Sequence, residues 1–492
     1  MGIVSKSSIK FSAISYFGIL LGYLNTVIIF PNLLSEEEFG LTRLIFIAAS
    51  LISQLAQLGI GNILIRFHPY LKDDKKNSTL SLGIIISLIG IALSATVLLG
   101  FDGYIKAYYN EKSALFSEYF YLLLPAVISL IVFNLFNSYL RVLLKNSFAA
   151  ILESVVLRLV WLGVVLLYGF GYFDTTTFLH IYVAGHISTS IALIIYAAKV
   201  KRFNLGFPLD SERWTLFKNM SKYGLVTIVS GLSLFLINKI DMMMVGSYVG
   251  LAEVGVYSIA LYMSMVIMVP ASSISRTTAV LTADAFKSGN SVLIKELYQK
   301  TALHQLLLGG MIYLLILINY ESLMSFLPDH FKDSFMVFFY LGLAKIVDTG
   351  LGINGAILIN SKYYKMDTVL SVGLLILSVI MKIYFIPTEG IIGAAFSTAL
   401  ALIIFNIIKY LILKLKLKLS PFTTNYIKAL LIIVLPLPVI YITPHFGNFL
   451  IDVPLKSGIY LAIAIPLLYF LNISAELNGM LHAVIRRIQQ IL

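Results

Sequence analysis

The residues that could do chemistry in this chain lie inside long apolar segments, where charged side chains are rare. The segment Leu225 to Tyr248 is long enough to cross a hydrocarbon core of about 30 Å, yet it carries Lys239 and Asp241. A lone charge near the centre of a bilayer costs roughly 2.5–3.5 kcal/mol. At about 100° per residue these two side chains point about 200° apart, so each needs a partner or water elsewhere. This predicts a helix that lines a hydrated cavity.

Three basic residues lie well inside apolar segments and could bind an anion there: Arg158, Lys239 and Lys345. An arginine can grip a phosphate through two parallel hydrogen bonds, whereas a lysine offers a compact charge. For these three the alternative is a structural ion pair between helices. Further candidates lie at segment ends, where topology or snorkelling toward water also explains a basic residue: Arg43, Arg66, Arg141 and Arg276.

Three acidic residues in the same segments could bind a proton or Na⁺: Glu153, Asp241 and Asp348. The pKa of a carboxyl group inside a membrane depends strongly on its surroundings, which suits ion coupling. Lys345 and Asp348 are three residues apart and share a helix face, so mutual neutralisation is the alternative for that pair. The histidines are expected to pack, and their spacing fits no metal site: His180, His186 and His304.

The composition predicts a membrane protein with many spans. Hydrophobic residues make up 59% of the 492 residues, charged residues 12%, and the mean hydropathy is +0.92. The absence of cysteine excludes disulfides, thiolate chemistry and cysteine metal sites. The first apolar run lacks a small-residue cleavage site, so we expect it to be the first transmembrane helix and not a signal peptide.

Fourteen apolar segments are long enough to be transmembrane helices. They are approximately residues 9–30, 44–65, 79–100, 119–138, 148–170, 176–198, 225–248, 255–280, 301–320, 335–359, 368–386, 390–413, 426–443 and 458–473. With the N-terminus inside, the inner loops and ends hold 27 of the 36 Lys and Arg residues and the outer loops hold 4. This asymmetry predicts cytoplasmic N- and C-termini.

Two pairs of matching segments indicate an internal repeat. SEEEFGLTRLIFI resembles GLAEVGVYSIALY 215 residues later, which aligns Glu38 with Glu253 and Gly40 with Gly255. NSYLRVLLKNSF resembles NGAILINSKYYK at an offset of 217. Six helices per half is an even number, so the halves are expected to be parallel repeats about a pseudo-twofold axis along the membrane normal.

The predicted organisation is therefore two six-helix lobes followed by two further helices. The boundaries are residues 1–200 for an N lobe, 201–222 for a cytoplasmic linker, 223–418 for a C lobe, 419–475 for the last two helices and 476–492 for a cytoplasmic amphipathic tail. Candidate hinges are Pro270 in the eighth segment and Gly350, Gly352 and Gly355 in the tenth. Close packing of helices is the alternative explanation for these glycines.

The EFGL turn after the first segment and the NKIDMMMVG segment with its EVGVY sequel resemble the polysaccharide or oligosaccharide flippase family. That family belongs to a transporter superfamily that also contains lipid II flippases and MATE drug antiporters. The resemblance implies two lobes around a V-shaped cavity, alternating access and a substrate built from sugars on a polyprenyl diphosphate. The first-helix arginines of many lipid II flippases have no counterpart here, where the first segment offers polar residues such as Asn25 as substrate ligands.

We therefore expect a flippase and not an enzyme. It would move a polyprenyl-diphosphate-linked O-antigen, capsule or exopolysaccharide unit to the outer leaflet of the bacterial inner membrane, driven by H⁺ or Na⁺. Besides its substrate, the expected partners are membrane lipids and polysaccharide assembly proteins, not nucleic acid. No cofactor is expected, and no phosphate-cradling Gly-Lys motif indicates direct use of ATP. The alternatives are a cation-coupled drug exporter, a lipid II flippase and a membrane glycosyltransferase.

Overall fold

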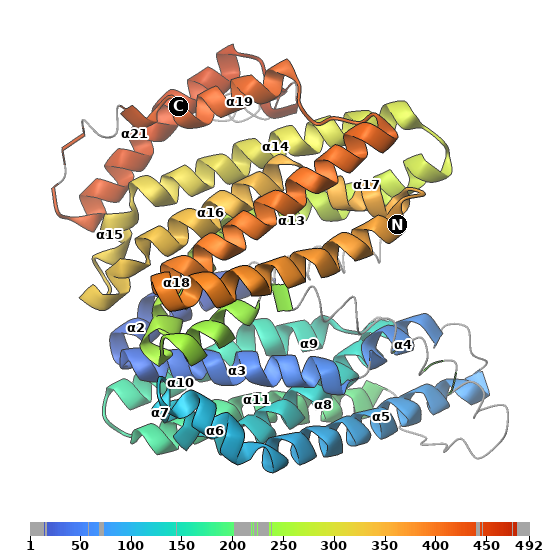
Figure 1. Cartoon of the computed structure of the whole chain (residues 1–492), viewed down its shortest axis with the longest axis vertical. Helices are drawn as coiled ribbons and strands as arrows, with labels where there is room; N and C mark the ends of the chain where they lie inside the picture. Colours follow the sequence, from blue (N-terminus) through green and yellow to red (C-terminus); the bar gives the residue numbers. More distant parts are fainter. Residues whose placement is uncertain are drawn as a thin grey trace. The chain divides into compact units, whose positions relative to one another are not determined.

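The computed structural model describes residue 14 and residues 17–57, 59–67, 73–143, 145–200, 218, 220, 224, 236–237, 239–438, 443–444, 446–474 and 476–479. Every regular element among these residues is a helix (Figure 1), so the predicted all-α class is confirmed. The structure divides into two compact units. The first is Met1–Ile259 with Ile383–Ile391, and the second is Ala260–Lys382 with Ile392–Leu492. The lobe boundaries expected from the repeat stay a prediction.

Nine described helices are long and apolar enough to cross a membrane. They are Glu36–Ala56, Thr79–Gly100, Phe120–Val142, Ser147–Gly169, Thr175–Val200, Leu251–Ser275, Ser291–Ile318, Tyr364–Leu417 and Phe449–Phe470. A tenth span is formed if Asp329–Gly350 and Asn354–Asn360, which are bent by 50°, count as one. The protein is thus a multi-span membrane protein, and the total of fourteen spans stays a prediction.

The predicted eleventh and twelfth spans are joined in one long element. Helix α18 (Tyr364–Leu417) has 54 residues, more than twice the length needed to cross a membrane. At Gly390 the backbone takes φ 57° and ψ −134°, so two helices meet there at a sharp break. A residue with a Cβ avoids this region, which explains why glycine stands at this position.

Two other predicted spans are shorter than expected within the described residues. The first apolar helix runs over Phe17–Leu33, and α19 covers Thr424–Val434. Of the seventh segment, the structure describes only residues 236–237 and 239–248. Apart from residues 218 and 220, the predicted linker lies outside the described residues, as does most of the C-terminal tail.

Helix caps explain why two spans begin earlier than predicted. Helix α14 (Ser291–Ile318) starts after Asn290, whose side chain accepts a hydrogen bond from the backbone N–H of Leu293. Helix α21 (Phe449–Phe470) starts after Asn448, whose side chain accepts from the N–H of Leu450. Such caps satisfy N–H groups that the helix itself leaves free, so these helices can begin before the predicted apolar segments.

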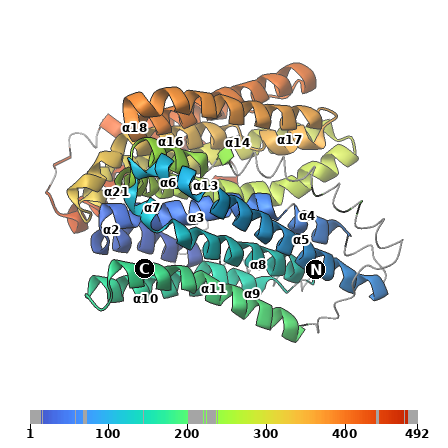
Figure 2. The same ribbon diagram turned by 60° about the horizontal axis from the view of Figure 1, so that its bottom comes forward.

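The first unit is built around α8 (Leu123–Val142), which packs against α3, α4, α5 and α11 (Figures 1 and 2). Its elements are η1 (Leu24–Ile29), α2 (Phe30–Leu33), α3 (Glu36–Ala56), α4 (Ile60–Phe67), α5 (Asp73–Gly100), α6 (Asp102–Asn110), α7 (Ala114–Glu118), η3 (Phe120–Leu122), α8, α9 (Ser147–Ile151), η4 (Leu152–Val156), α10 (Leu157–Gly169), α11 (Thr175–Val200) and the start of α13 (Leu251–Lys287).

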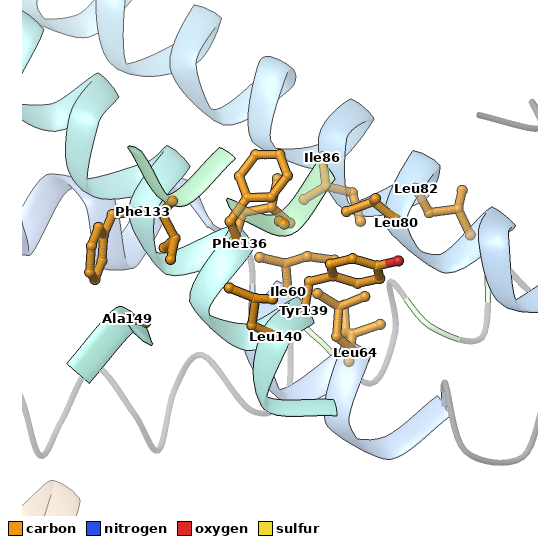
Figure 3. Close-up of a cluster of buried hydrophobic side chains, with 14 of the residues drawn as sticks. Ile60, Leu64, Leu80, Leu82, Ile86, Phe133, Phe136, Tyr139, Leu140 and Ala149 are labelled. Carbon is orange, nitrogen blue, oxygen red and sulfur yellow. The ribbon is translucent and has the colours of Figure 1, made fainter. Parts of the chain in front are cut away.

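Buried apolar side chains from these helices form a continuous core. Figure 3 shows Leu64 of α4, Ile86 of α5 and Phe136 with Leu140 of α8 in this cluster. Leu64 and Leu140 are completely buried. Close van der Waals packing of these side chains holds the three helices together, because lipid supplies no hydrophobic driving force between membrane helices.

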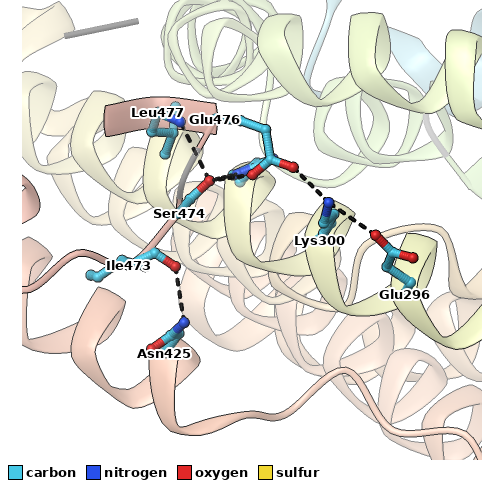
Figure 4. A network of polar contacts seen from close by, with 8 residues as sticks. Glu296, Lys300, Asn425, Ile473, Ser474, Glu476 and Leu477 are labelled. Atoms are coloured by element: carbon cyan, nitrogen blue, oxygen red, sulfur yellow. Dashed lines mark hydrogen bonds and ion pairs between the residues drawn. The ribbon is translucent and has the colours of Figure 1, made fainter. Parts of the chain in front are cut away.

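The second unit packs α14 against α16 (Phe335–Gly350) and α19, and α21 against α15 (Tyr320–Met324) and α19. It also contains the rest of α13, η5 (Asp329–Ser334), α17 (Asn354–Asn360) and most of α18. At its C-terminal end, Lys300 of α14 binds both Glu296 at 3.0 Å and Glu476 at 2.6 Å (Figure 4). This ion pair attaches the start of the tail to α14.

The predicted hinge residues lie at two different kinds of position. Gly350 ends α16, and Gly352 lies in the break before α17 with φ +58°. A Cβ at Gly352 would lie 2.7 Å from the backbone nitrogen of Ala302, so the glycine is required by both backbone and packing. Pro270 lies within α13, which continues as one helix through it.

Candidate functional site

Asn25 and Arg158 meet in the first unit, where Asn25 lies in the π-helical segment η1 and Arg158 lies at the start of α10, just after the π-helical segment η4. Asn25 lies in η1, is 3% exposed and donates a hydrogen bond of 2.7 Å to the carbonyl oxygen of Arg158. A Cβ at Gly22 would lie 2.6 Å from Nη1 of Arg158, so this glycine lets the guanidinium approach the helix backbone. π-Helical segments inside helices are frequent at functional sites because they offset the side chains that follow.

Glu153 lies in the second of these segments, η4, close to two of the predicted cations. The positive charges of Arg158 and Arg141 both attract its carboxylate. Arg141 stands in the last turn of α8, and Glu153 and Arg141 are exposed on the surface of the described structure. The fold therefore gathers one carboxylate and two guanidinium groups that the sequence could only name separately.

Arg43 is held by aromatic rings. The Cζ atom of Arg43 lies 5.1 Å from the centre of the Phe30 ring and 5.0 Å from that of Phe39. Both rings are completely buried, and they lie on either side of the turn that separates α2 from α3. The Nε and Nη2 atoms of Arg43 are buried and have no hydrogen-bond partner in the described part of the chain. Cation–π contacts with the two rings thus stabilise the guanidinium of Arg43, while two of its N–H donor atoms have no acceptor among the described residues.

Lys239 and Asp241 differ in their surroundings, as their opposite directions on the helix predicted. Asp241 is 3% exposed and accepts a hydrogen bond of 2.5 Å from the hydroxyl of Tyr257 on α13. Lys239 is half-buried, and it has no hydrogen bond or ion pair within the described residues. The carboxylate is thus fixed between two helices, whereas the ammonium is available to a ligand.

In the second unit, Asp348 belongs to a hydrogen-bonded chain of side chains. Asn406 of α18 donates to Asp348 of α16 at 3.1 Å, and Asn354 of α17 donates to Asn406 at 3.0 Å. Asn406 is 1% exposed and Asn354 is 6% exposed. Across the described residues no ion pair joins Lys345 to Asp348, so the two do not neutralise each other in this structure.

An ion pair next to this chain was not anticipated. Lys409 of α18 lies 2.8 Å from Asp367, with its Nζ 4.2 Å from the centre of the Phe405 ring. A Cβ at Gly355 would lie 3.5 Å from that Nζ, so the predicted hinge glycine borders the ion pair. Lys409 lies in the predicted span 390–413 and was not among the candidate residues. The signal in the sequence was its spacing of three residues from Asn406, which places both on one helix face.

A second polar group that sequence reasoning missed joins three helices of the first unit. The carboxylate of Glu38 accepts hydrogen bonds from Tyr168 at 2.5 Å, from Thr175 at 2.7 Å and from the backbone N–H of Ser35 at 2.9 Å. Ser35 and Glu38 have the spacing of a capping box, which was the available signal. Glu38 had been used only as a marker of the repeat.

The remaining predicted residues give less information. Arg66 stands in α4 and Arg276 in α13, but their side chains lie outside the described part of the structure. Among the described residues no three His, Cys, Asp or Glu side chains could hold a metal ion together. His186 lies between aromatic rings and near the Ser129 hydroxyl, as expected of a packing residue.

The comparison with protein families identifies two matches. A family described as polysaccharide biosynthesis protein matches residues 5–281, which is more than half of the chain. The MatE family matches residues 227–347. No curated protein matches the chain in sequence.

Solved transporter structures share the fold. The structure of the lipid II flippase MurJ in an inward closed conformation is 15% identical, with a TM-score of 0.76 over 94% of this chain and 99% of that chain. An inward-facing multidrug resistance MATE family transporter of the MOP superfamily is 17% identical, with a TM-score of 0.62 over 81% and 92%. A mutant of the Vibrio cholerae MATE transporter VcmN is 14% identical, with a TM-score of 0.53 over 84% and 98%.

At such low identities these structures establish the fold alone, while the family match covers the N-terminal half and beyond. The fold and the family match agree with the resemblance that the motifs predicted. The chain therefore belongs to the polysaccharide biosynthesis protein family, and it is a multi-span membrane transporter, not an enzyme.

Proposed function

We propose that this protein moves a polyprenyl-diphosphate-linked oligosaccharide from the inner to the outer leaflet of the bacterial inner membrane. The substrate would be an O-antigen, capsule or exopolysaccharide repeat unit. The observation that carries the proposal is Arg43, whose buried Nε and Nη2 atoms have no hydrogen-bond partner among the described residues. A diphosphate supplies the acceptor oxygens and the negative charge that this guanidinium lacks.

The other predicted cations are proposed as further contacts of the substrate. Arg158 and Lys239 lie on membrane helices, and Asn25 holds the backbone at Arg158 through a hydrogen bond of 2.7 Å. Lys345 carries a further positive charge on α16. Several separate cations bind a diphosphate less tightly at any one position than a closed cage would, which suits a carrier that must release its cargo. Arg66, Arg141 and Arg276 are proposed as entry positions.

Coupling to H⁺ or Na⁺ is assigned to the carboxylates. Asp241 is buried beside the Tyr257 hydroxyl, and Asp348 accepts from Asn406. Glu153 lies within the electrostatic reach of two arginines. A carboxylate that gains a proton or sodium ion loses its net charge, which changes the relative stability of two conformations that expose it differently.

The proposed cycle uses the two six-helix lobes, residues 1–200 and 223–418, with both chain ends in the cytoplasm. Alternating access requires bends, for which the break at Gly350 to Gly355 and Pro270 are the candidates. The last two helices, within residues 419–475, would then lie beside the lipid tail. Polysaccharide assembly proteins are candidate partners on the outer side.

The proposal is tested with purified protein in vesicles that contain a fluorescent polyprenyl diphosphate sugar. Substitutions Lys239→Gln and Arg158→Gln are expected to abolish translocation without preventing membrane insertion, because each removes a charge on the proposed path. Lys295→Ala, at an exposed position of α14, removes one charge elsewhere and is the matched control.

Full translocation by both variants would remove these residues from the mechanism. If the wild-type protein exports a cationic dye from the same vesicles and leaves the sugar lipid in place, the drug exporter is the correct function.

A further inference from the structure

Helix α6 begins where a membrane-spanning helix ends. The span Thr79–Gly100 within α5 has 22 residues, which make about 33 Å of helix and are enough to cross a hydrocarbon core of about 30 Å. At Phe101 the backbone takes φ −107° and ψ 12°, and α6 changes direction there (Figure 1). The start of α6 therefore lies at a membrane surface, which is the outer surface in the predicted topology.

One side of α6 packs on the rest of the first unit. Tyr109 is 9% exposed, and the centre of its ring lies 4.8 Å from that of Phe116 on α7. The backbone carbonyl of Lys106 accepts a hydrogen bond of 3.0 Å from Ser117, and the Lys106 ammonium lies 2.9 Å from the carboxylate of Asp102. These contacts determine which side of α6 faces away from the protein.

The exposed side of α6 carries aromatic residues along one line and small or polar residues along another. Tyr104 is 75% exposed and Tyr108 is 51% exposed, and they lie one helical turn apart. The Tyr108 hydroxyl lies 3.5 Å from that of Ser247, while most of its ring is open. Ala107 and Asn110 are also exposed, and at about 100° per residue Asn110 points about 120° away from Tyr104. The helix is thus amphipathic on its exposed side.

The aromatic line on α6 continues the apolar exposed side of α5. Leu93 and Val97 of the span are 55% and 52% exposed, and Phe101, four residues after Val97, is 59% exposed. The N–H of Phe101 donates 2.9 Å to the Val97 carbonyl, and the Phe101 carbonyl accepts 2.9 Å from the N–H of Ile105. Helical hydrogen bonds therefore pass through the bend, and the exposed apolar residues run from the span to Tyr104 without interruption.

We propose that α6 is an interfacial helix, which lies on the membrane surface with the rings of Phe101, Tyr104 and Tyr108 among the lipid headgroups. Tyrosine suits this depth because its ring is apolar and its hydroxyl is polar. The ion pair of Asp102 and Lys106, whose side chains are 39% and 37% exposed, stays in contact with water. The partner of this surface is the lipid itself. The inference requires only that the chain spans a membrane, so it does not depend on the proposed function.

The absence of cysteine allows a nitroxide label to be attached at a single chosen position. The variants are Tyr104→Cys, Asn110→Cys on the other line of α6, and Val97→Cys as the reference within the span. In vesicles of phosphatidylethanolamine and phosphatidylglycerol, collisions with oxygen report lipid and collisions with a nickel chelate report water. An interfacial helix places its apolar side about 5–10 Å into the headgroup region, so the oxygen-to-nickel ratio at 104 should be about threefold or more above that at 110.

Hydrogen exchange supplies a second test, in which the helix carries no label. A helix of nine residues is too short to be stable alone in water, so its amide protection depends on its contacts. In the same vesicles Tyr104→Ser is expected to raise the exchange rate of residues 103–110 about fivefold or more, because the ring no longer anchors the helix. Serine and tyrosine have similar helix propensities. Asn110→Ser is the matched control and should leave the rate unchanged.

Equal oxygen-to-nickel ratios at 104 and 110, or unchanged exchange in Tyr104→Ser, would overturn the interfacial helix. A label at 104 that is open to nickel until the sugar lipid is added would also overturn it, because the rings would then stack on sugars and not on lipid. Neither measurement depends on transport. A protein that meets both expectations but moves no sugar lipid therefore retains the interfacial helix and loses the proposed function.

Discussion

The two units of this protein treat a buried cation in opposite ways. In the first, Arg43 lies between the rings of Phe30 and Phe39, and two of its nitrogen atoms lack hydrogen-bond partners in the described residues. In the second, Lys409 is 8% exposed and paired with Asp367 at 2.8 Å. A buried charge is costly unless an opposite charge or hydrogen bonds compensate it. We infer that a ligand completes the site of Arg43, whereas Lys409 already has its counter-charge and belongs to the fold.

The first prediction separates transport from stability at Arg43. Substitution Arg43→Met is expected to lower translocation of the sugar lipid about 100-fold, because loss of one partner of a desolvated charge pair costs about 2–5 kcal/mol. Its apparent thermal midpoint in detergent should be unchanged or higher, because the variant no longer buries an uncompensated charge. Vesicle translocation and a thermal unfolding assay on the same preparation measure both effects.

Arg43→Lys sharpens this prediction. Lysine keeps the charge but lacks the planar fork, so translocation should lie between the wild-type rate and that of Arg43→Met. A large loss of thermal stability in Arg43→Met would show that the arginine supports the fold, and the distinction between the two cations would fail.

The second prediction concerns Lys409, where substitution is expected to lower the stability of the protein. Lys409→Met leaves Asp367 without its counter-charge, and breaking a buried ion pair in this way costs about 3–5 kcal/mol. We expect a clear drop in the apparent thermal midpoint. The double variant Lys409→Met with Asp367→Asn should recover most of it, because it removes the unpaired charge.

If the double variant is stable but does not transport, the ion pair contributes to the mechanism as well as to the fold. If Lys409→Met alone is as stable as the wild-type protein, the pair is not the structural element that its burial suggests.

The contrast between the two cations explains which features the sequence could predict. Membrane helices follow from the length and polarity of a local segment, so most spans were found near their observed positions. Charges inside those segments, such as Lys239 and Arg158, were visible for the same reason. Partners depend on how distant segments pack. Asp367 lies near the start of α18 and Lys409 lies near its end, on the other side of the break at Gly390. Nothing in the local sequence pattern indicates that these two residues form a pair.

The aromatic support of Arg43 shows a further limit. Phe30 and Phe39 are close to Arg43 in sequence, but the turn after α2, capped by Ser35 and Glu38, decides that both rings face the guanidinium. The positions at which helices break are also only partly predictable from the sequence. The glycines of the tenth segment indicated a bend, whereas Gly390 was expected only as the start of a helix and proved to be the break inside α18.

The third prediction concerns an exposed ion pair, whose loss should lower the thermal stability less than the loss of the Lys409 pair. Lys300 and Glu476 are 2.6 Å apart, but their side chains are 47% and 46% exposed. The hydrogen bond from Lys300 lowers the pKa of Glu476 from its usual 4.5 to about 2. Because this folded-state pKa is depressed, the stabilisation is present above about pH 4.5 and is lost as the pH falls toward 2. Water screens such a pair, so Glu476→Gln should lower the apparent thermal midpoint at pH 7 by no more than about 2 °C.

The difference between wild type and Glu476→Gln should shrink steadily as the pH falls from 4.5 toward 2, because Glu476 becomes protonated over this range and then carries no charge in either protein. Glu296→Gln is the matched control, since Glu296 binds the same Lys300 at 3.0 Å from within α14 and does not attach the tail. A loss of stability in Glu476→Gln as large as that in Lys409→Met would mean that burial does not decide the strength of these pairs. The interpretation of Lys409 as a structural cation and of Arg43 as a ligand-binding one would then lose its physical basis.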